Sequence, residues 1–256
     1  MAWIARAAAL SAILLFFAAG ASPQAAPGAA AHETLDYSVE WRLTRAGTAK
    51  FSFSSFNGAA PTGASTGEVR LHLESAGLVS RLFRVNDDYT AMLGANLCAQ
   101  NSFLAAHEGN RNRETRVVYD YLNRKAVYVE KDLNKNTVTN HDVDIPSCVH
   151  DVFGGLMVLR NLHLEPGKTA QIPISDGKKF VQAKVESQRR EEIKTELGTF
   201  KTVRYEIFLF DNILYKRSGH LHVWLTDDDR RLPVQLQVRL QFAIGTITFR
   251  LEKEEK

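Results

Sequence analysis

Large apolar and polar side chains alternate along residues 35–43, which read LDYSVEWRL. Successive side chains of a β-strand point to opposite faces, so this pattern places five apolar residues on one face of a strand. After a turn predicted at residues 44–47, Ala49, Phe51 and Phe53 alternate with polar residues in the same way. The two segments are therefore predicted to form a β-hairpin.

The same period of two recurs along the rest of the chain. It predicts further strands at residues 69–73, 203–209, 221–225, 234–242 and 247–251. Turn signals such as Asn123-Arg124, Pro166-Gly167 and Asp176-Gly177 separate the apolar segments. Helical segments do not alternate with these strands, so the expected fold class is all-β and mainly antiparallel. The apolar face of the sheet is predicted to include Leu35, Tyr37, Val39, Trp41, Phe51, Phe53, Val234, Leu236, Val238 and Leu240.

One short helix is predicted near residues 148–160. Val149, Val152, Phe153 and Leu156 follow the i, i+3, i+4, i+7 spacing of a helix with one apolar face. Pro146-Ser147 precedes this segment and suits a helix start. The pair Gly154-Gly155 weakens the helix, and we interpret it as a place where the helix approaches the sheet closely.

The balance of strands and helix predicts a curved sheet. Burying five large apolar side chains stabilises a protein by roughly 10 kcal/mol, whereas the net stability of a whole domain is about 5–15 kcal/mol. The apolar face must therefore be covered, and one short helix cannot cover so many strands. We predict a strongly curved sheet or open barrel, which either packs solid or leaves an apolar cleft.

The first residues predict export. Residues 1–21 combine a basic start, a short apolar run and small residues before a cleavage site, as in a secretory signal peptide. The apolar run is shorter than the roughly 20 residues of a membrane-spanning helix. Residues 22–32 are a low-complexity tether, and residues 33–256 are expected to form a single domain. The mature protein is predicted to be periplasmic or extracellular.

Charge and cysteine content fit this compartment. The formal net charge of the chain is +3, which gives no sign of a nucleic-acid partner. In an exported chain the two cysteines, Cys98 and Cys148, favour a disulfide, although two buried thiols are the alternative. A bridge that closes a loop of this length stabilises the fold by roughly 4 kcal/mol in the chain-entropy description.

Motifs that suggest catalysis or cation binding mostly lack the neighbouring elements or ligands that those functions require. Residues 63–67 match the G-x-S-x-G pattern of hydrolases but lack a preceding strand and a following helix. Asp132-Leu133-Asn134-Lys135-Asn136 resembles the start of a calcium loop without its later glycine and glutamate. Asp227-Asp228-Asp229 is interpreted as a solvated hairpin tip rather than a cation site. No cofactor is expected, and no acid–base pair is indicated.

Two sets of basic side chains remain as weak candidates. His220 and His222 lie on one face of a predicted strand and could contribute to a metal site, but a polar outer face is the preferred interpretation and no metal is expected there. Three groups of arginines could contact anionic lipid head groups at a membrane surface, or could simply be solvated: Arg111, Arg113 and Arg116; Arg189 and Arg190; Arg230 and Arg231.

Several of these segments together resemble a family of exported bacterial proteins known only as a domain of unknown function. The resemblance rests on the opening strand that ends in Ala46-Gly47, a segment that begins with Asp151 and ends in Leu159-Arg160, the turn Pro166-Gly167, and the late motifs at residues 224–228 and 232–234. It spans nearly the whole mature chain. It implies an antiparallel, barrel-like exported domain, and it brings no catalytic residues with it.

Three functions follow as hypotheses. The first is a non-enzymatic envelope protein that binds a lipid-like or other apolar ligand in the concave face of its sheet. The second is an envelope assembly factor whose exposed strand edges add a strand of a partner protein. The third, which the sequence supports least, is a hydrolase of envelope material with its site near His220 and His222.

Overall fold

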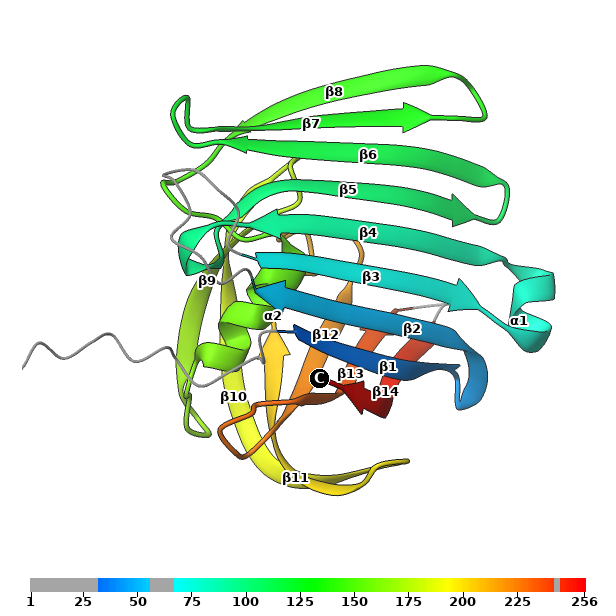
Figure 1. Cartoon of the computed structure of the whole chain (residues 1–256), viewed down its shortest axis with the longest axis vertical. Helices are drawn as coiled ribbons and strands as arrows, with labels where there is room; N and C mark the ends of the chain where they lie inside the picture. The colour runs from blue at the N-terminus through cyan, green and yellow to red at the C-terminus, as the bar shows by residue number, and fades with distance from the viewer. Residues whose placement is uncertain (1–31, 56–66, 242–244) are drawn as a thin grey trace, which may run out of the picture.

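The computed structural model describes residues 32–55, 67–241 and 245–256. Within these ranges the chain is built mainly from strands, with two short α-helices and one short 3-10 helix (Figure 1). The strands are β1 (His32–Trp41), β2 (Thr44–Ser55), β3 (Gly67–Ser75), β4 (Val85–Leu93), β5 (Ala99–Glu108), β6 (Arg111–Asp120), β7 (Lys125–Asp132), β8 (Thr137–Asp144), β9 (Thr169–Ser175), β10 (Phe180–Thr195), β11 (Gly198–Ile207), β12 (Gly219–Thr226), β13 (Pro233–Leu240) and β14 (Gly245–Glu255). The helices are α1 (Gly77–Leu82), the 3-10 helix η1 (Ala95–Leu97) and α2 (Val152–Asn161).

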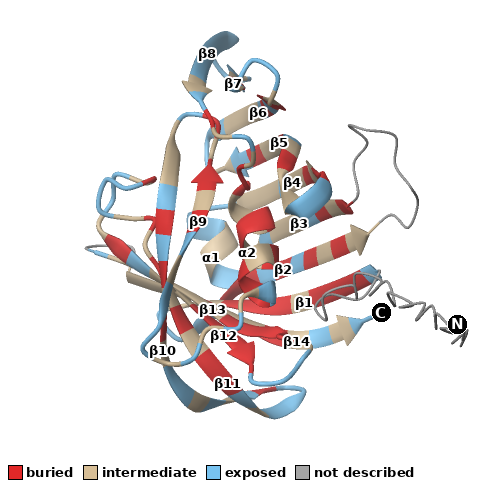
Figure 2. Ribbon diagram, turned by 90° about the vertical axis from the view of Figure 1, so that its left-hand side faces the viewer, coloured by how far each residue is buried: buried red, intermediate tan, exposed pale blue. Residues whose placement is uncertain are grey.

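All the strands belong to one 14-stranded sheet in the order β8-β7-β6-β5-β4-β3-β2-β1-β14-β13-β12-β11-β10-β9. Neighbouring strands are antiparallel throughout, and β1 and β14, from opposite ends of the described chain, pair in the middle of the sheet. The sheet curls so that β1–β4 and β9–β13 form two walls, with α2 between them (Figure 2). The sheet does not close, because β8 and β9 are its two edges. The prediction of a curved, mainly antiparallel sheet is confirmed.

The residues of the predicted apolar face are buried to different degrees. Leu35, Tyr37, Val39, Phe51, Phe53 and Val234 are at most 6 % exposed. Trp41, Leu236, Val238 and Leu240 are only half-buried. The inner face is therefore densely packed around β1 and β2 and less completely filled toward β13.

The first hairpin turn lies earlier than predicted. The turn is Arg42-Leu43, with φ angles of 49° and 69°, and β2 begins at Thr44. Two-residue hairpin turns of type I′ have positive φ at both positions, and their twist matches that of the strands. Leu43 therefore leaves the apolar face to which its spacing assigned it and is 93 % exposed. The alternation predicts which face a residue takes but not where its strand ends.

Other element boundaries also differ from the predictions, and two short helical segments were not predicted. The strand predicted at residues 203–209 ends at Ile207, and Leu209 is buried in the following loop. The α1 and η1 segments, at residues 77–82 and 95–97, were not predicted. The predicted inner helix is α2, but it begins at Val152, after the cap residue Asp151, rather than after Pro146-Ser147. Asp151 accepts hydrogen bonds from the Phe153 and Gly154 backbone N–H groups, as an aspartate at the N-cap position of a helix commonly does.

The first anchor of α2 is at its N-terminal end. The Tyr89 hydroxyl of β4 donates a hydrogen bond of 2.8 Å to Asp151 Oδ2. A Cβ atom on Gly154 would lie 3.2 Å from Leu93 Cδ2, and one on Gly155 would lie 3.0 Å from Ile174 Cδ1. The two glycines therefore allow α2 to approach β4 on one side and β9 on the other.

The second anchor of α2 is a buried ion pair at its C-terminal end. The Arg160 guanidinium contacts both carboxylate oxygens of Glu33 in β1, and the side chains of Arg160 and Glu33 are only 1 % and 4 % exposed. Arg160 also donates to the carbonyl oxygens of Arg230 and Arg231. In return, Arg231 donates to the Arg160 and Leu162 carbonyl oxygens and to the Tyr205 hydroxyl. The helix is thus joined to β1, to the β12–β13 turn and to β11.

The third attachment is covalent. Cys98 and Cys148 form a disulfide with a Cα–Cα distance of 5.2 Å, as predicted. Beside it, the Ala99 N–H group donates to the Val149 carbonyl oxygen at 2.8 Å, and the Tyr121 hydroxyl donates to the Ala99 carbonyl oxygen at 2.6 Å. The segment that leads into α2 is therefore fixed to the start of β5.

We expect the Arg160–Glu33 pair to be coupled. Arg160→Met or Glu33→Leu alone should lower the free energy of unfolding by about 3–5 kcal/mol, because each leaves an unpaired buried charge. The double variant should lose less than the sum of the two single losses. Urea denaturation of the four proteins measures this. Arg45→Ala, which breaks the exposed pair with Glu252, is the control and should change the stability little. Strictly additive losses would show that the pair is not coupled.

We also expect the disulfide to contribute measurably to stability. The bridge spans a sequence separation of 50 residues, and a loop of that length corresponds to about 4 kcal/mol of lost unfolded-state entropy. The double variant Cys98→Ala/Cys148→Ala should therefore unfold at lower denaturant concentration than the oxidised wild type. Adding a reductant should lower the midpoint of the wild type and leave that of the variant unchanged. A wild-type midpoint that does not respond to the reductant would contradict this expectation.

Candidate functional site

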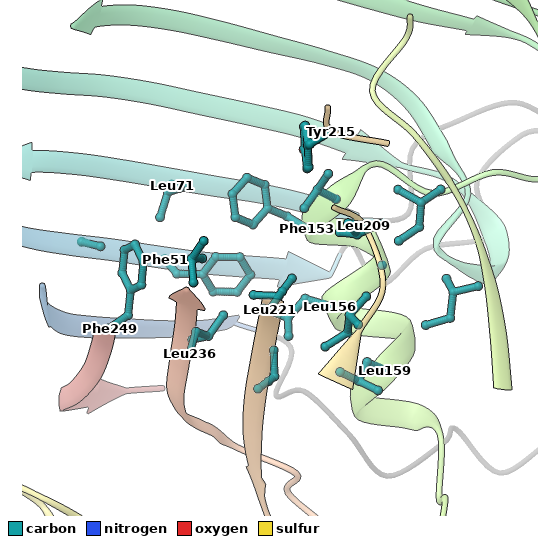
Figure 3. A pocket seen from close by; sticks show the side chains of 18 of the residues that line it. Phe51, Leu71, Phe153, Leu156, Leu159, Leu209, Tyr215, Leu221, Leu236 and Phe249 are labelled. Atoms are coloured by element: carbon teal, nitrogen blue, oxygen red, sulfur yellow. The ribbon is translucent and has the colours of Figure 1, made fainter. Parts of the chain in front are cut away.

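An apolar cavity lies between α2 and the concave face of the sheet. Its volume is about 330 Å³, within the range of small-molecule pockets. Figure 3 shows apolar side chains from α2 and from several strands pointing into this space. The lining comes from β1–β3, β9 and β11–β14, from α2 and from the β11–β12 loop, and contains no charged residue: Tyr37, Ala49, Phe51, Leu71, Leu73, Val152, Phe153, Gly155, Leu156, Leu159, Ile172, Ile174, Ile207, Leu209, Phe210, Tyr215, Leu221, Val223, Leu236, Val238 and Phe249.

The cavity exists because α2 is too short to fill the curve of the sheet. Inward-pointing Leu71, Leu221, Leu236 and Phe249 remain only half-buried. On the helix side, Phe153 packs against Tyr89 with a ring-centroid distance of 4.9 Å, which holds its ring at the cavity wall. Protein interiors normally pack as densely as organic crystals, so an apolar space of this size leaves dispersion contacts unmade. An apolar ligand would supply those contacts.

A second cavity, of about 400 Å³, adjoins the first. The two share Leu71, Leu73, Val152, Phe153 and Tyr215 as lining residues, so they are neighbours around the N-terminal end of α2. The second cavity extends along β4–β7 and, unlike the first, is lined by charged and polar side chains as well as apolar ones; it is called the polar cavity below. Its lining adds Asp87, Tyr89, Ser102, Leu104, Arg113, Thr115, Val117, Tyr119, Tyr128, Glu130, Asp151, Ser175, Asp176 and Lys178.

Ionisable groups in the polar cavity have shifted pKa values. Burial raises the pKa of Asp151, while the hydrogen bonds from Tyr89 and from two backbone N–H groups oppose that shift in part. Burial also raises the pKa of Tyr89 well above its usual value, and the neighbouring Asp151 carboxylate adds to the effect. For Asp87, burial raises the pKa against the lowering effects of the His107 N–H group and the Arg113 charge. Each of these acids therefore sits in a partly dehydrated environment.

Glu130 differs from these acids because its partners are cationic and phenolic. Partial burial alone would raise its pKa, but the hydrogen bond from Tyr128 and the charge of Lys178 hold the pKa of Glu130 below its usual value. The Tyr128 hydroxyl lies 2.5 Å from Glu130 Oε2, and Lys178 Nζ lies 3.6 Å from the same oxygen. Lys178 Nζ also lies 4.2 Å from the centroid of the Tyr128 ring. Glu130 is thus an ionised, fully engaged carboxylate.

The histidines singled out in the sequence lie away from both cavities. Leu221 and Val223 line the apolar cavity, so His220 and His222 point to the opposite, outer face of β12. Glu206 Oε1 lies 2.8 Å from His220 Nδ1, and Glu206 Oε2 lies 3.7 Å from His222 Nε2. Burial lowers the pKa of His222. In the described part of the chain, no three His, Cys, Asp or Glu side chains gather as a metal site would require.

The arginine groups of the sequence separate into individual contacts. Arg111, Arg189, Arg190 and Arg230 each contact one or two carboxylates. Arg116 lies over the Phe103 ring. Arg231 is 4 % exposed and fixes the end of α2, so it cannot reach a membrane surface.

The remaining motifs are turns or fall outside the described ranges. Asp132 Oδ1 accepts the Asn134 and Lys135 N–H groups, which makes that segment a capped turn. Asp227 pairs with Arg190, and Asp228 accepts hydrogen bonds from Thr226 and Arg231. The signal peptide, the tether up to residue 31, and residues 63–66 of the G-x-S-x-G motif lie outside the described residues.

The sequence predicted an apolar cavity only as the alternative to a solidly packed interior. It did not predict the polar cavity. A signal for the polar cavity was present in β6, where Arg113, Thr115, Val117 and Tyr119 occupy alternate positions and all point into it. The inward face of that strand therefore changes from polar to apolar along its length. What the sequence could not show is that residues 175–178 and Tyr215 complete the same wall from distant parts of the chain.

Across the described ranges, no helix combines the length and apolar character needed to cross a bilayer.

A solved structure with a TM-score above 0.5 supports the fold. A beta-barrel-like protein of the domain of unknown function DUF1849 from Brucella abortus shares 9% identity with a TM-score of 0.54, over 88% of this chain and 97% of that one. A protein with a YmcC-like fold from Bacteroides fragilis shares 12% identity with a TM-score of 0.32, over 90% and 98% of the two chains. Likeness at such identities concerns the fold alone.

The comparison of sequences gives the family. No curated protein of known activity matches the chain. One family profile matches residues 36–252, nearly the whole of the part that the structure describes. The chain belongs to this family, which is described as a protein of unknown function, DUF3108.

Proposed function

We propose that this chain is an exported, non-enzymatic protein of the cell envelope that binds a lipid-like ligand inside its curved sheet. The observation that carries the proposal is the 330 Å³ cavity whose lining has no charged side chain. Filling such a space with a hydrocarbon chain removes apolar surface from water, at about 25 cal/mol per Å². The predicted signal peptide supports a location where lipids and lipid-linked molecules are exchanged between membranes.

The position of α2 supports binding over simple packing. Because α2 is held at Asp151 and at Arg160, it cannot move inward to fill the space that the curved sheet encloses. A rigid, preformed apolar pocket binds its ligand without first ordering a loop, which lowers the entropic cost of binding.

We expect a bulky substitution inside the cavity to prevent binding. Val238→Trp places an indole in the apolar cavity and should weaken binding of the fluorescent apolar probe 1-N-phenylnaphthylamine at least about tenfold, as the lost contacts imply. Fluorescence titration of the purified mature protein measures this. Arg239→Trp is the matched control, since Arg239 is the next residue, is exposed and points to the outer face of β13.

Two results would count against the proposal. One is equal probe binding by both variants, with Leu221→Trp as a second cavity-filling variant should Val238→Trp fail to fold. The other is the absence of any probe binding by the folded wild type.

We also expect the natural ligand to co-purify. Mature protein isolated without detergent, extracted with organic solvent and analysed by mass spectrometry should yield a lipid-like molecule in near-stoichiometric amount. The extract of Val238→Trp, prepared in parallel, should contain much less of it, because the indole occupies the same space. Equal lipid in both extracts would indicate adventitious surface binding.

A second candidate function rests on the edge strand β8. Its outer edge carries no strand partner within the described residues, and most of its side chains are exposed. A partner protein could add a strand there. In-cell crosslinking from Asn140 would capture one specific envelope protein if β8 is used in this way, whereas its absence together with bound lipid would favour the first function.

A further inference from the structure

The two neighbouring cavities beside α2 differ chemically, and this difference specifies the ligand more closely. The apolar cavity suits a hydrocarbon chain, as proposed above. The polar cavity, of about 400 Å³, is large enough for a head group and shares Leu71 and Phe153 with the apolar cavity. The inference that follows rests on the proposed function, because a head group lies in the polar cavity only if the tail of the same molecule occupies the apolar cavity.

The two cations of the polar cavity are already paired within the protein. Two cations, Arg113 and Lys178, face four carboxylates, those of Asp87, Glu130, Asp151 and Asp176. Lys178 lies beside Glu130, and Arg113 Nη2 lies 3.2 Å from Glu108 Oε2. An anionic head group would therefore find both cations already paired and would meet an excess of negative charge in a partly buried space.

Three of the four carboxylates also have partners within the protein, and the fourth, Asp87, lies in the field of the Arg113 charge, which opposes a bound cation. Asp151 accepts the Tyr89 hydroxyl and two N–H groups at the start of α2. Asp176 Oδ1 accepts the Lys178 and Lys179 N–H groups, each at 2.9 Å. Glu130 is held by Tyr128 and Lys178. Each of these three carboxylates therefore already has hydrogen-bond or ionic partners in the cavity wall.

Hydrogen-bonding capacity remains at Asp87 and Arg113. Asp87 Oδ1 accepts the His107 N–H group, and the adjacent Arg113 charge acts on the same carboxyl group. Arg113 Nε is buried without a hydrogen-bond partner among the described residues. Both side chains line the cavity, from strands β4 and β6 that flank β5. A hydroxyl group both donates and accepts, so neighbouring hydroxyls would satisfy such a pair without bringing in net charge.

We propose that the polar cavity holds an uncharged, hydroxyl-rich head group, of the glycosyl or glyceryl type, on a single-chain amphiphile whose tail lies in the apolar cavity. Asp87 accepts from one hydroxyl of this head group and Arg113 donates to another. Tyr89, Tyr119 and Tyr128 supply aromatic walls, on which the C–H faces of a sugar or glycerol pack.

A series of probes with one tail and different head groups tests this proposal. Dodecyl glucoside, monododecanoyl glycerol, dodecanoate and dodecyltrimethylammonium, each below its micelle concentration, displace 1-N-phenylnaphthylamine from the mature wild type. The two uncharged probes should displace it at concentrations about tenfold lower than either charged probe, as a hydrogen-bonded pair implies. Comparing the glucoside with the glycerol ester distinguishes a sugar from a glycerol head group.

A double variant assigns the preference to its residues. Asp87→Ala/Arg113→Met removes one charge of each sign and should abolish the preference for uncharged head groups while leaving binding of the apolar probe unchanged. Asp88→Ala/Arg116→Met is the matched control, because these two exposed residues lie on the outer face of the same strands.

The outcomes separate the two proposals. Tightest binding of a charged probe, or a preference that survives in Asp87→Ala/Arg113→Met, would overturn the head-group proposal while leaving apolar binding intact. Failure of the apolar probe to bind the folded wild type would overturn the proposed function and the head-group proposal with it.

Discussion

The buried pair of Arg160 and Glu33 determines where the inner helix of this protein can lie. Glu33 belongs to β1, at the centre of the sheet, whereas Arg160 ends α2, and the two are 127 positions apart in the chain. At the other end of α2, Asp151 is held by the Tyr89 hydroxyl, and the Cys98–Cys148 disulfide fixes the preceding segment. Because a buried ion pair is costly to break once formed, these attachments hold the ten-residue helix α2 in one position inside the curved 14-stranded sheet.

The cavity follows from that arrangement. A curved sheet with one apolar face encloses more space than a helix of three turns can occupy, and α2 is prevented from settling against one wall alone. Its glycines bring it close to β4 and β9, yet Phe51, Leu236 and Phe249 on other strands still face open space. The anchors that stabilise the helix therefore also maintain a pocket. The same anchor at Asp151 forms part of the polar wall, so fold and site share residues at the point where the apolar and polar cavities meet.

The period of two identified β1–β3 and β11–β14 and their inward face, because pleating ties side-chain direction to sequence position. It gave no ranges for β4–β10, between Val85 and Thr195. It failed where strands end. Leu43 keeps the spacing of an apolar-face residue yet lies in a two-residue turn, and Leu209 continues the pattern of β11 into a loop. The resemblance to a family of unknown function included the segment from Asp151 to Arg160, but only the structure shows that its first and last residues are the two anchors of α2.

The sequence by itself determined the all-β antiparallel class, the inner helix, the disulfide partners and the apolar character of the concave face. These properties depend on local periodicity, on composition, or on there being two cysteines to pair. Only the tertiary structure decided that the interior is hollow, that a polar cavity lies beside the apolar one, and that His220 and His222 face outward while Asp87 and Arg113 face inward. Those outcomes depend on how far the sheet curls and on which distant segments meet, and side-chain alternation within a strand carries no information about either.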